Sequence, residues 1–204
     1  MLNCDIIWGE RGILMYILYL DTHDQEVVVA LFKDEKMIKV VNKVSGYQHS
    51  QVVLPTIKEL LDEYELSPND LGEIVVVIGP GSFTGVRIAV TIAKTMAYTL
   101  GIPLKTIDSL FLKALSCQSV SDYYVSVLEK NGAYVGKFSK ELEKIGDYAY
   151  YSKSEYEKFL LKNIVIDVDK IDFEKAIHYL RKENAVNPHS VKPLYIKRIE
   201  ALKK

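Results

Sequence analysis

The sequence has little cysteine and no apolar run long enough to cross a membrane. Its 204 residues include two cysteines, Cys4 and Cys117, which are too few and too far apart to indicate a disulfide framework or a metal site. The apolar runs at 16–20 and 74–78 fall far short of the roughly 20 residues that span a bilayer. We therefore expect a protein that folds without disulfides in the reducing cytoplasm and makes no contact with a membrane.

An excess of charge of either sign is also missing. Lys and Arg number 26 and Asp and Glu number 27, which gives a formal net charge of −1. Nucleic acid is held through an excess of positive charge, so no field of the whole protein draws this chain onto RNA. Any contact with RNA is expected to be local or to come through a partner.

Residues 1–14 lack the basic first region and the uninterrupted apolar region of a signal peptide. Met15 then opens an apolar strand. We therefore expect that Met15 is the true start, and that residues 1–14 are an upstream start or a disordered extension. The alternative is an additional strand around 6–8, which β-propensity allows.

The first half of the chain changes its hydrophobic period in a regular order. Short apolar and β-branched runs predict three successive strands, and apolar residues at helical spacing then predict a helix after Ser50. The expected strands are 16–21, 26–32, 37–43, 74–78 and 104–107, and the expected helices are 50–64, 84–100 and 109–115. This order predicts an α/β protein of the ribonuclease-H/actin-like fold with a mixed five-stranded sheet flanked by helices. A doubly wound sheet would instead alternate strand and helix from the start.

The second half is less regular. Two β-rich runs at 123–128 and 133–138 predict a hairpin around Asn131-Gly132, which is a strong turn dipeptide. A helix at 155–161, a strand at 164–168 and a helix at 173–181 are expected to follow. We interpret this half as a shortened, degenerate copy of the first. The expected lobes are 15–108 and 109–204, closely packed, with a C-terminal segment that could pack back on the first lobe.

A long motif follows the apolar run at 74–78. Residues 79–88 read GPGSFTGVRI, and further motifs are Asp21-Thr22, His49-Ser50, Gly101-Ile102-Pro103 and the C-terminal PLYIKR at 193–198. In these motifs the chain resembles the TsaB (YeaZ) family. The middle of the chain departs from the family: residues 127–134 read VLEKNGAY where the family has an Asp-Ala-Arg segment before Glu-Val-Tyr.

The resemblance implies a non-catalytic scaffold subunit of the machinery that forms N6-threonylcarbamoyladenosine at position 37 of tRNAs reading codons that begin with A. In that family the subunit pairs with a catalytic paralogue, TsaD, and an ATPase subunit, TsaE, joins them, so that tRNA is met through the complex. A homodimer of the chain alone is a further possibility. The alternative from the enzyme class is a phosphotransferase or ATPase of the actin-like fold, or a peptidase acting on the partner.

The glycine-rich motif has a functional and a structural interpretation. Glycines let backbone amides at a helix start approach an anion, but a tight turn from strand to helix needs the same glycines. The motif is not a Walker loop, and the sequence shows neither a second Asp-x-Gly phosphate loop nor a Gly-Gly adenosine motif. We therefore expect a vestigial phosphate loop that needs no cofactor, with weak or interface binding of a nucleotide left open. Its residues are Asp21, Thr22, Gly79, Gly81, Ser82, Thr84 and Gly85.

The helix at 84–100 carries a ridge of small residues. At 100° per residue a small-residue row lies beside a row of large apolar residues, and the apolar arc is wider than a surface helix needs. One interpretation is a partner interface made by Gly85, Ile88, Ala89, Ile92, Ala93, Met96 and Ala97, which remains exposed in the free chain. The other is burial of the ridge within the lobe.

No metal site or catalytic residue is expected. His49 has Val53 four positions later, so the pair of histidines that holds a metal in the catalytic relative is missing, and one histidine rarely holds a metal alone. Ser82 is not in a Gly-x-Ser-x-Gly elbow, because Phe83 and Thr84 separate it from the next glycine.

Overall fold

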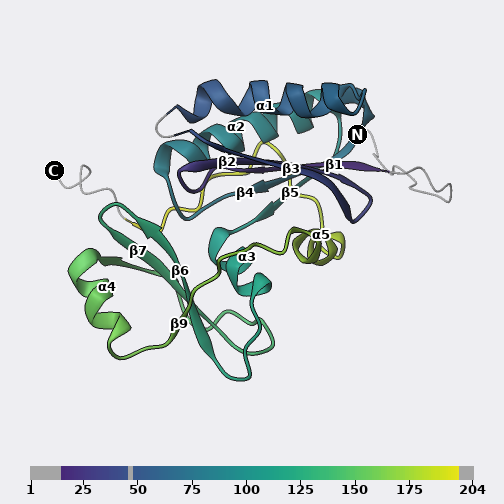
Figure 1. The fold of residues 1–204 in the computed structure, drawn as a ribbon. Helices are drawn as coiled ribbons and strands as arrows, with labels where there is room; N and C mark the ends of the chain where they lie inside the picture. The colour runs from purple at the N-terminus through teal and green to yellow at the C-terminus, as the bar shows by residue number, and fades with distance from the viewer. Residues whose placement is uncertain (1–14, 46–47, 198–204) are drawn as a thin grey trace.

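The computed structural model describes residues 15–45 and 48–197. The expectations for residues 1–14 therefore lie outside the described residues. The described part of the chain has two sheets, and in the view of Figure 1 one lies above the other with helix α3 (Ser109–Ser116) between them.

Sheet A forms lobe I and has five strands in the order β3-β2-β1-β4-β5. The first hairpins pair antiparallel, whereas β1 pairs parallel with β4 and β4 parallel with β5. The mixed five-stranded sheet predicted from the element order is thereby confirmed. The strands are β1 (Tyr16–Asp21), β2 (Glu26–Lys33), β3 (Lys36–Val44), β4 (Leu71–Val77) and β5 (Leu104–Ile107).

Two helices, α1 (His49–Glu63) and α2 (Phe83–Leu100), cover the upper face of sheet A (Figure 1). A short 3-10 helix, Pro68–Asp70, precedes β4. Helix α2 starts where the Ser82 side chain accepts a hydrogen bond from the Gly85 amide, and it ends at Gly101, whose φ of 65° suits glycine. The apolar run of β4 is buried on both faces, as the sequence predicts for a central strand.

Sheet B forms lobe II and has four strands in the order β8-β7-β6-β9. The hairpin of β6 and β7 turns at Lys130-Asn131, beside the predicted Asn-Gly dipeptide. Strand β8 was not predicted. The elements are β6 (Tyr123–Glu129), β7 (Gly132–Phe138), β8 (Ala149–Ser152), β9 (Val165–Ile166) and the outer helix α4 (Lys153–Leu160).

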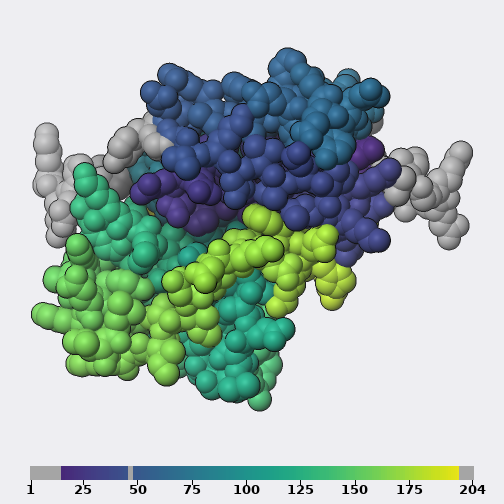
Figure 2. Space-filling view, viewed as in Figure 1, coloured from purple at the N-terminus to yellow at the C-terminus, as the bar shows by residue number. Residues whose placement is uncertain are grey.

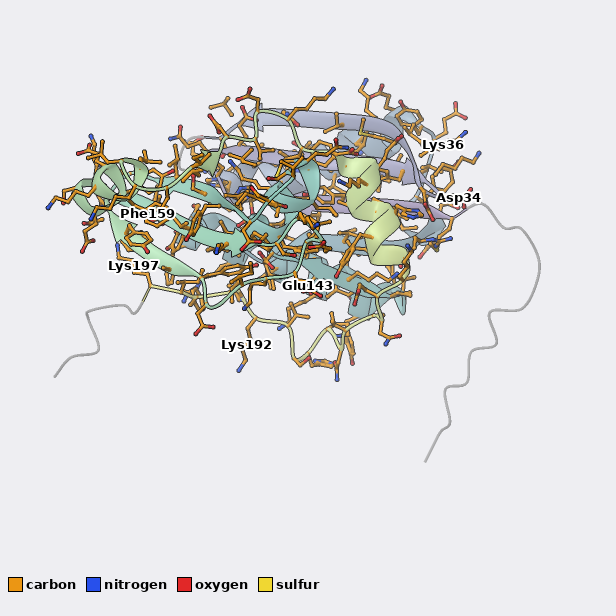
Figure 3. The ribbon with its side chains drawn as sticks, turned by 90° about the horizontal axis from the view of Figure 1, so that it is seen from below. Asp34, Lys36, Glu143, Phe159, Lys192 and Lys197 are labelled. Atoms are coloured by element: carbon orange, nitrogen blue, oxygen red, sulfur yellow. The ribbon has the colours of Figure 1, made fainter. Side chains whose placement is uncertain are left out.

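Helices α3 (Ser109–Ser116) and α5 (Phe173–Arg181) lie under sheet A (Figure 1). Leu112 of α3 and Ile177 of α5 belong to the apolar core beneath sheet A, whereas Leu110 of α3 belongs to the core of lobe II. Figure 3, seen from below, shows α5 lying across the strands of sheet A. The chain between β9 and α5 passes from lobe II to lobe I on the face shown in Figure 2.

Residues 183–197, here called the C-terminal strap, return from α5 to lobe I and then to lobe II. The Val186 amide donates to the Leu104 carbonyl of β5 at 2.8 Å, and Lys94 Nζ of α2 donates to the Val191 carbonyl at 2.8 Å. The Leu194 amide then donates to the Ile78 carbonyl at 2.7 Å, beside the glycine loop. The strap thus covers the edge of sheet A and one flank of α2.

The small-residue ridge of α2 is inside lobe I. Ala89 and Ala93 have no exposed surface and Ala97 is 1% exposed, because sheet A and α1 pack against this side of the helix. The prediction that Gly85, Ala89, Ala93 and Ala97 remain exposed in the free chain is therefore wrong, and burial within the lobe is what the structure has. The large residues of the predicted surface, Ile88, Ile92 and Met96, are only half-buried.

We predict that Ala93→Glu unfolds or strongly destabilises the chain. A carboxylate there would be buried without a partner, which costs at least about 3 kcal/mol and lowers the melting temperature by roughly 10 °C. Thr91→Glu, on the exposed side of the same helix, is the matched control and should leave the melting temperature nearly unchanged. Circular dichroism on heating measures both, and an Ala93→Glu variant as stable as the control would contradict the packing of α2.

Candidate functional site

The glycine loop before α2 is closed by the chain's own backbone. The Ser82 amide donates to the His23 carbonyl at 2.7 Å, and Thr22 Oγ1 donates to the Gly85 carbonyl at 2.6 Å. A Cβ added at Gly81 would stand 2.1 Å from the His23 carbonyl oxygen, and one at Gly85 would stand 2.1 Å from that of Thr22. These glycines thus admit the 22–23 backbone to the place where an anion would approach the loop.

Asp21, at the end of β1, also has its partners within the chain. The carboxylate is 4% exposed, and its Oδ1 accepts from the His23 amide at 2.9 Å and lies 2.6 Å from His23 Nδ1. Its Oδ2 accepts from the Tyr19 hydroxyl at 3.4 Å. Both oxygens are therefore engaged by neighbouring side chains and backbone.

The charges of this cluster shift the pKa values of its members. Burial alone would lower the pKa of His23, but attraction to the Asp21 carboxylate, the hydrogen bond to it and the nearby Asp24 together raise that pKa above its usual value. Burial, followed by repulsion from Asp21, raises the pKa of Tyr19 well above its usual value. The arrangement favours a charged His23 beside Asp21 and a neutral Tyr19.

A cleft of about 340 Å³ opens beside the loop, between the two lobes. Its walls come from the start of α2, the β6–β7 hairpin and the strap, and they include Gly81, Phe83, Glu129, Tyr134, Tyr195 and Lys197. Lys197, labelled in Figure 3, lies at the end of the strap, with its ammonium 4.4 Å from the centre of the Tyr150 ring. Burial, followed by the charge of Glu129, raises the pKa of Tyr134 to about 12, so its hydroxyl is neutral.

Arg87 of α2 contacts Phe83 and Tyr195, two of the residues that line this cleft. Its guanidinium carbon lies 3.7 Å from the centre of the Phe83 ring and 5.4 Å from that of Tyr195. Its Nε donates to the Tyr195 hydroxyl at 2.6 Å. Two rings and a hydroxyl therefore fix the orientation of an exposed guanidinium.

No group of His, Cys, Asp and Glu side chains in the described ranges is arranged to hold a metal ion. His49 is buried, and its Nε2 lies 2.9 Å from the Asp24 carbonyl oxygen, so the ring joins the start of α1 to the β1–β2 turn. Among the helices of the described residues, none is both long and apolar enough to cross a bilayer.

Comparison with known proteins gives a consistent result. The family described as TsaD, tRNA N6-adenosine threonylcarbamoyltransferase, matches residues 36–129. The "tRNA threonylcarbamoyladenosine biosynthesis protein TsaB" of Bacillus subtilis is 41% identical over 96 residues, which are 47% of this chain and 42% of that protein. Its namesake from Haemophilus influenzae is 28% identical over 174 residues, which are 83% of this chain and 69% of that protein.

Over about half of its length the chain is similar to proteins named TsaB. The chain spans about half the length of the first curated relatives that it matches. Among solved structures, "YeaZ from Pseudomonas aeruginosa" superposes with a TM-score of 0.71 at 20% identity, over 89% of this chain and all of that one. This likeness shows that the two-lobed fold is shared.

The structure brings together most of the residues predicted for the vestigial loop. Asp21, Gly81 and Ser82 lie around His23, and Gly85 lies against Thr22, whereas Thr84 is exposed on α2. The Gly79 carbonyl accepts from the Ser109 amide at 2.8 Å and so joins the loop to α3. Sequence reasoning missed His23, although its position two residues after Asp21 is a known spacing for side chain to backbone contact. It also missed Arg87, Phe83 and Tyr195, because Tyr195 is distant in sequence.

We predict that Gly85→Ala destabilises the protein by about 1–3 kcal/mol, because the new Cβ would collide with the Thr22 carbonyl. Helix propensity alone predicts the opposite sign, since Ala is favoured over Gly by about 1 kcal/mol. Thr84→Ala, one residue earlier and exposed, is the control and should stay within about 0.5 kcal/mol of wild type. Denaturant unfolding measures the three chains. A Gly85→Ala chain more stable than wild type would contradict the close approach.

We predict that the contribution of His23 to stability depends on pH. Because its folded pKa is raised above the unfolded value near 6.5, the contribution is complete below that pH and is lost as the pH rises through the folded pKa. The free energy of unfolding should therefore fall more for wild type than for His23→Gln between about pH 6 and about pH 8.5. Equal falls in the two chains would show that the pair with Asp21 contributes no such linkage.

Proposed function

We propose that the chain is a non-catalytic scaffold subunit of the complex that forms N6-threonylcarbamoyladenosine at position 37 of tRNA. The observation that carries this proposal is the closure of the glycine loop by Thr22 and His23, with Asp21 bonded to His23. A phosphate loop that is filled by its own chain supports a role in binding rather than in ATP turnover. The names of the matched relatives supply the pathway.

The partner in this proposal is the catalytic transferase that the family description names, a TsaD-type chain. Its contact surface on this chain is the half-buried row Ile88, Ile92 and Met96 of α2. Apolar side chains gathered along one side of a helix form the kind of surface that pairs with another protein.

The remaining members of the complex follow from the same proposal. A TsaE-type ATPase subunit joins the pair in the cytoplasm and supplies the ATP chemistry that this chain lacks. The chain's net charge of −1 supports contact with tRNA through the complex rather than by the chain alone.

Reconstitution from purified subunits tests the proposal. With the cognate transferase, the ATPase subunit, ATP, threonylcarbamoyl adenylate as the donor and tRNA as the acceptor, we expect threonylcarbamoyladenosine to form, with release of AMP, only when this chain is added, and mass spectrometry of the nucleosides measures it. The chain alone should not hydrolyse ATP. Full modification without the chain, or ATP turnover that Asp21→Ala abolishes, would refute the scaffold role.

Ile92→Glu tests the contact surface when its affinity for the purified transferase is measured. A charge introduced among half-buried apolar side chains should weaken binding of the transferase by roughly tenfold or more. Lys162→Glu, exposed at the end of α4 in lobe II, should bind as wild type does. Both variants should remain folded by circular dichroism. Unchanged affinity of a folded Ile92→Glu chain would move the interface to another face.

A further inference from the structure

Arg87 is ordered without the anion that usually orders an arginine. The Phe83 ring supports one face of the guanidinium at 3.7 Å, and the Tyr195 hydroxyl accepts from Nε at 2.6 Å. Within the described ranges, no carboxylate lies within ion-pair distance of Arg87 and no acceptor bonds its Nη1 or Nη2. The terminal edge of the guanidinium is therefore held in one orientation, and among the described residues its Nη1 and Nη2 have no acceptor.

That edge is suited to an oxyanion. The two terminal nitrogens of a guanidinium match the two oxygens of a carboxylate, or two of a phosphate, through parallel hydrogen bonds. A side chain that is already held loses less entropy when it makes those bonds. Because the stack spans α2 and the strap, two parts of the chain far apart in sequence hold the same group.

The surroundings of Arg87 are those of a protein-binding site. Phe83 is 42% exposed and Tyr195 is 48% exposed, so both rings remain open to a partner. The cleft of about 340 Å³ that they line can receive an apolar side chain. Aromatic residues and arginine around a pocket are the composition of residues that dominate protein–protein affinity.

A phosphate of RNA is the less favoured occupant. Glu129 and Lys197 both line the same cleft, so one acidic and one basic side chain offset each other there, and the chain as a whole carries a net charge of −1. RNA backbones are bound by several cations along a groove, and Arg87 and Lys197 with a glutamate in the same cleft do not form such a groove. The charge and the exposed rings together favour one carboxylate with an apolar neighbour.

We propose that Phe83, Arg87 and Tyr195 form a docking site for an acidic side chain of a protein partner, whose apolar neighbour enters the adjacent cleft. The partner is the cognate transferase, so this inference rests on the proposed function. The site extends the contact from the half-buried row of α2 to the start of that helix and the end of the strap.

Titration calorimetry with the purified cognate transferase tests the site. Arg87→Ala should weaken binding by at least about thirtyfold, the effect of losing a residue that dominates an interface. Arg87→Lys keeps the charge but loses the planar pair of donors, so it should still weaken binding on the order of tenfold. Tyr195→Phe removes only the hydroxyl that holds Nε and should weaken binding several-fold, with both rings retained.

Two controls define the result. Lys162→Ala removes an exposed cation of lobe II and should bind as wild type does. Glu200→Gln removes a carboxylate of the chain's own C-terminal end and should also leave the affinity unchanged. Circular dichroism should show every variant folded, since Arg87 and Tyr195 are exposed.

A second experiment tests RNA as the alternative occupant. Fluorescence anisotropy measures the affinity of the chain for an unmodified tRNA transcript, and this affinity should be the same for Arg87→Ala as for wild type. If Arg87→Ala weakens the binding of tRNA and leaves that of the transferase unchanged, the site is for phosphate and our inference is overturned. For RNA, the logarithm of the affinity would also fall with the logarithm of salt concentration with a slope of about −0.9 per phosphate held.

The inference and the proposed function fail in different ways. If wild type binds the transferase, and Arg87→Ala and Arg87→Lys bind equally well, the docking site is refuted while the scaffold role stands. If wild type does not bind the transferase at all, the proposed function is refuted and the inference is refuted with it.

Discussion

The contact between the 22–23 backbone and the glycine loop is the constraint on which the rest of lobe I depends. The carbonyls of Thr22 and His23 lie where any side chain on Gly85 or Gly81 would stand, so the turn after β1 and the start of α2 can only come together without those side chains. With the turn and the helix start in contact, Asp21 is buried, the His23 ring lies 2.6 Å from its carboxylate, and α2 packs against the sheet. The same contact that positions the helix also fills the space beside the glycines of the loop.

The strands and helices of lobe I could be predicted from the spacing of apolar residues in the sequence. The three opening strands, the apolar β4 and the long α2 each have a period that local physics fixes, and the structure has all of them. Strand β8 has four half-buried residues and no apolar period of its own, so only its pairing with β7 reveals it. The packing of α5 could not be predicted from the sequence either. An amphipathic pattern shows that a helix has an apolar face but does not show which sheet covers that face.

The sequence predicted which residues form the glycine loop but not what lies against them. A glycine-rich turn is equally suited to an anion and to a close backbone, and the sequence does not say which one arrives. The small residues of α2 posed the same question: Ala89 and Ala93 indicate that something approaches closely, and here it is the chain's own sheet and α1. The Phe83–Arg87–Tyr195 stack joins residues more than a hundred positions apart, beyond the reach of any local pattern.

Helix α3 takes part in two cores at once. Leu112 and Leu115 pack under sheet A, whereas Leu110 and Ala114 pack into lobe II, and Asp108 at its start accepts from Tyr148 of lobe II at 3.2 Å. A hinge between lobes needs a connection that can bend without exposing apolar surface, and this connection is a helix buried on both sides. A change in the angle between the two lobes would therefore separate apolar side chains of α3 from one of the two cores and expose them to water.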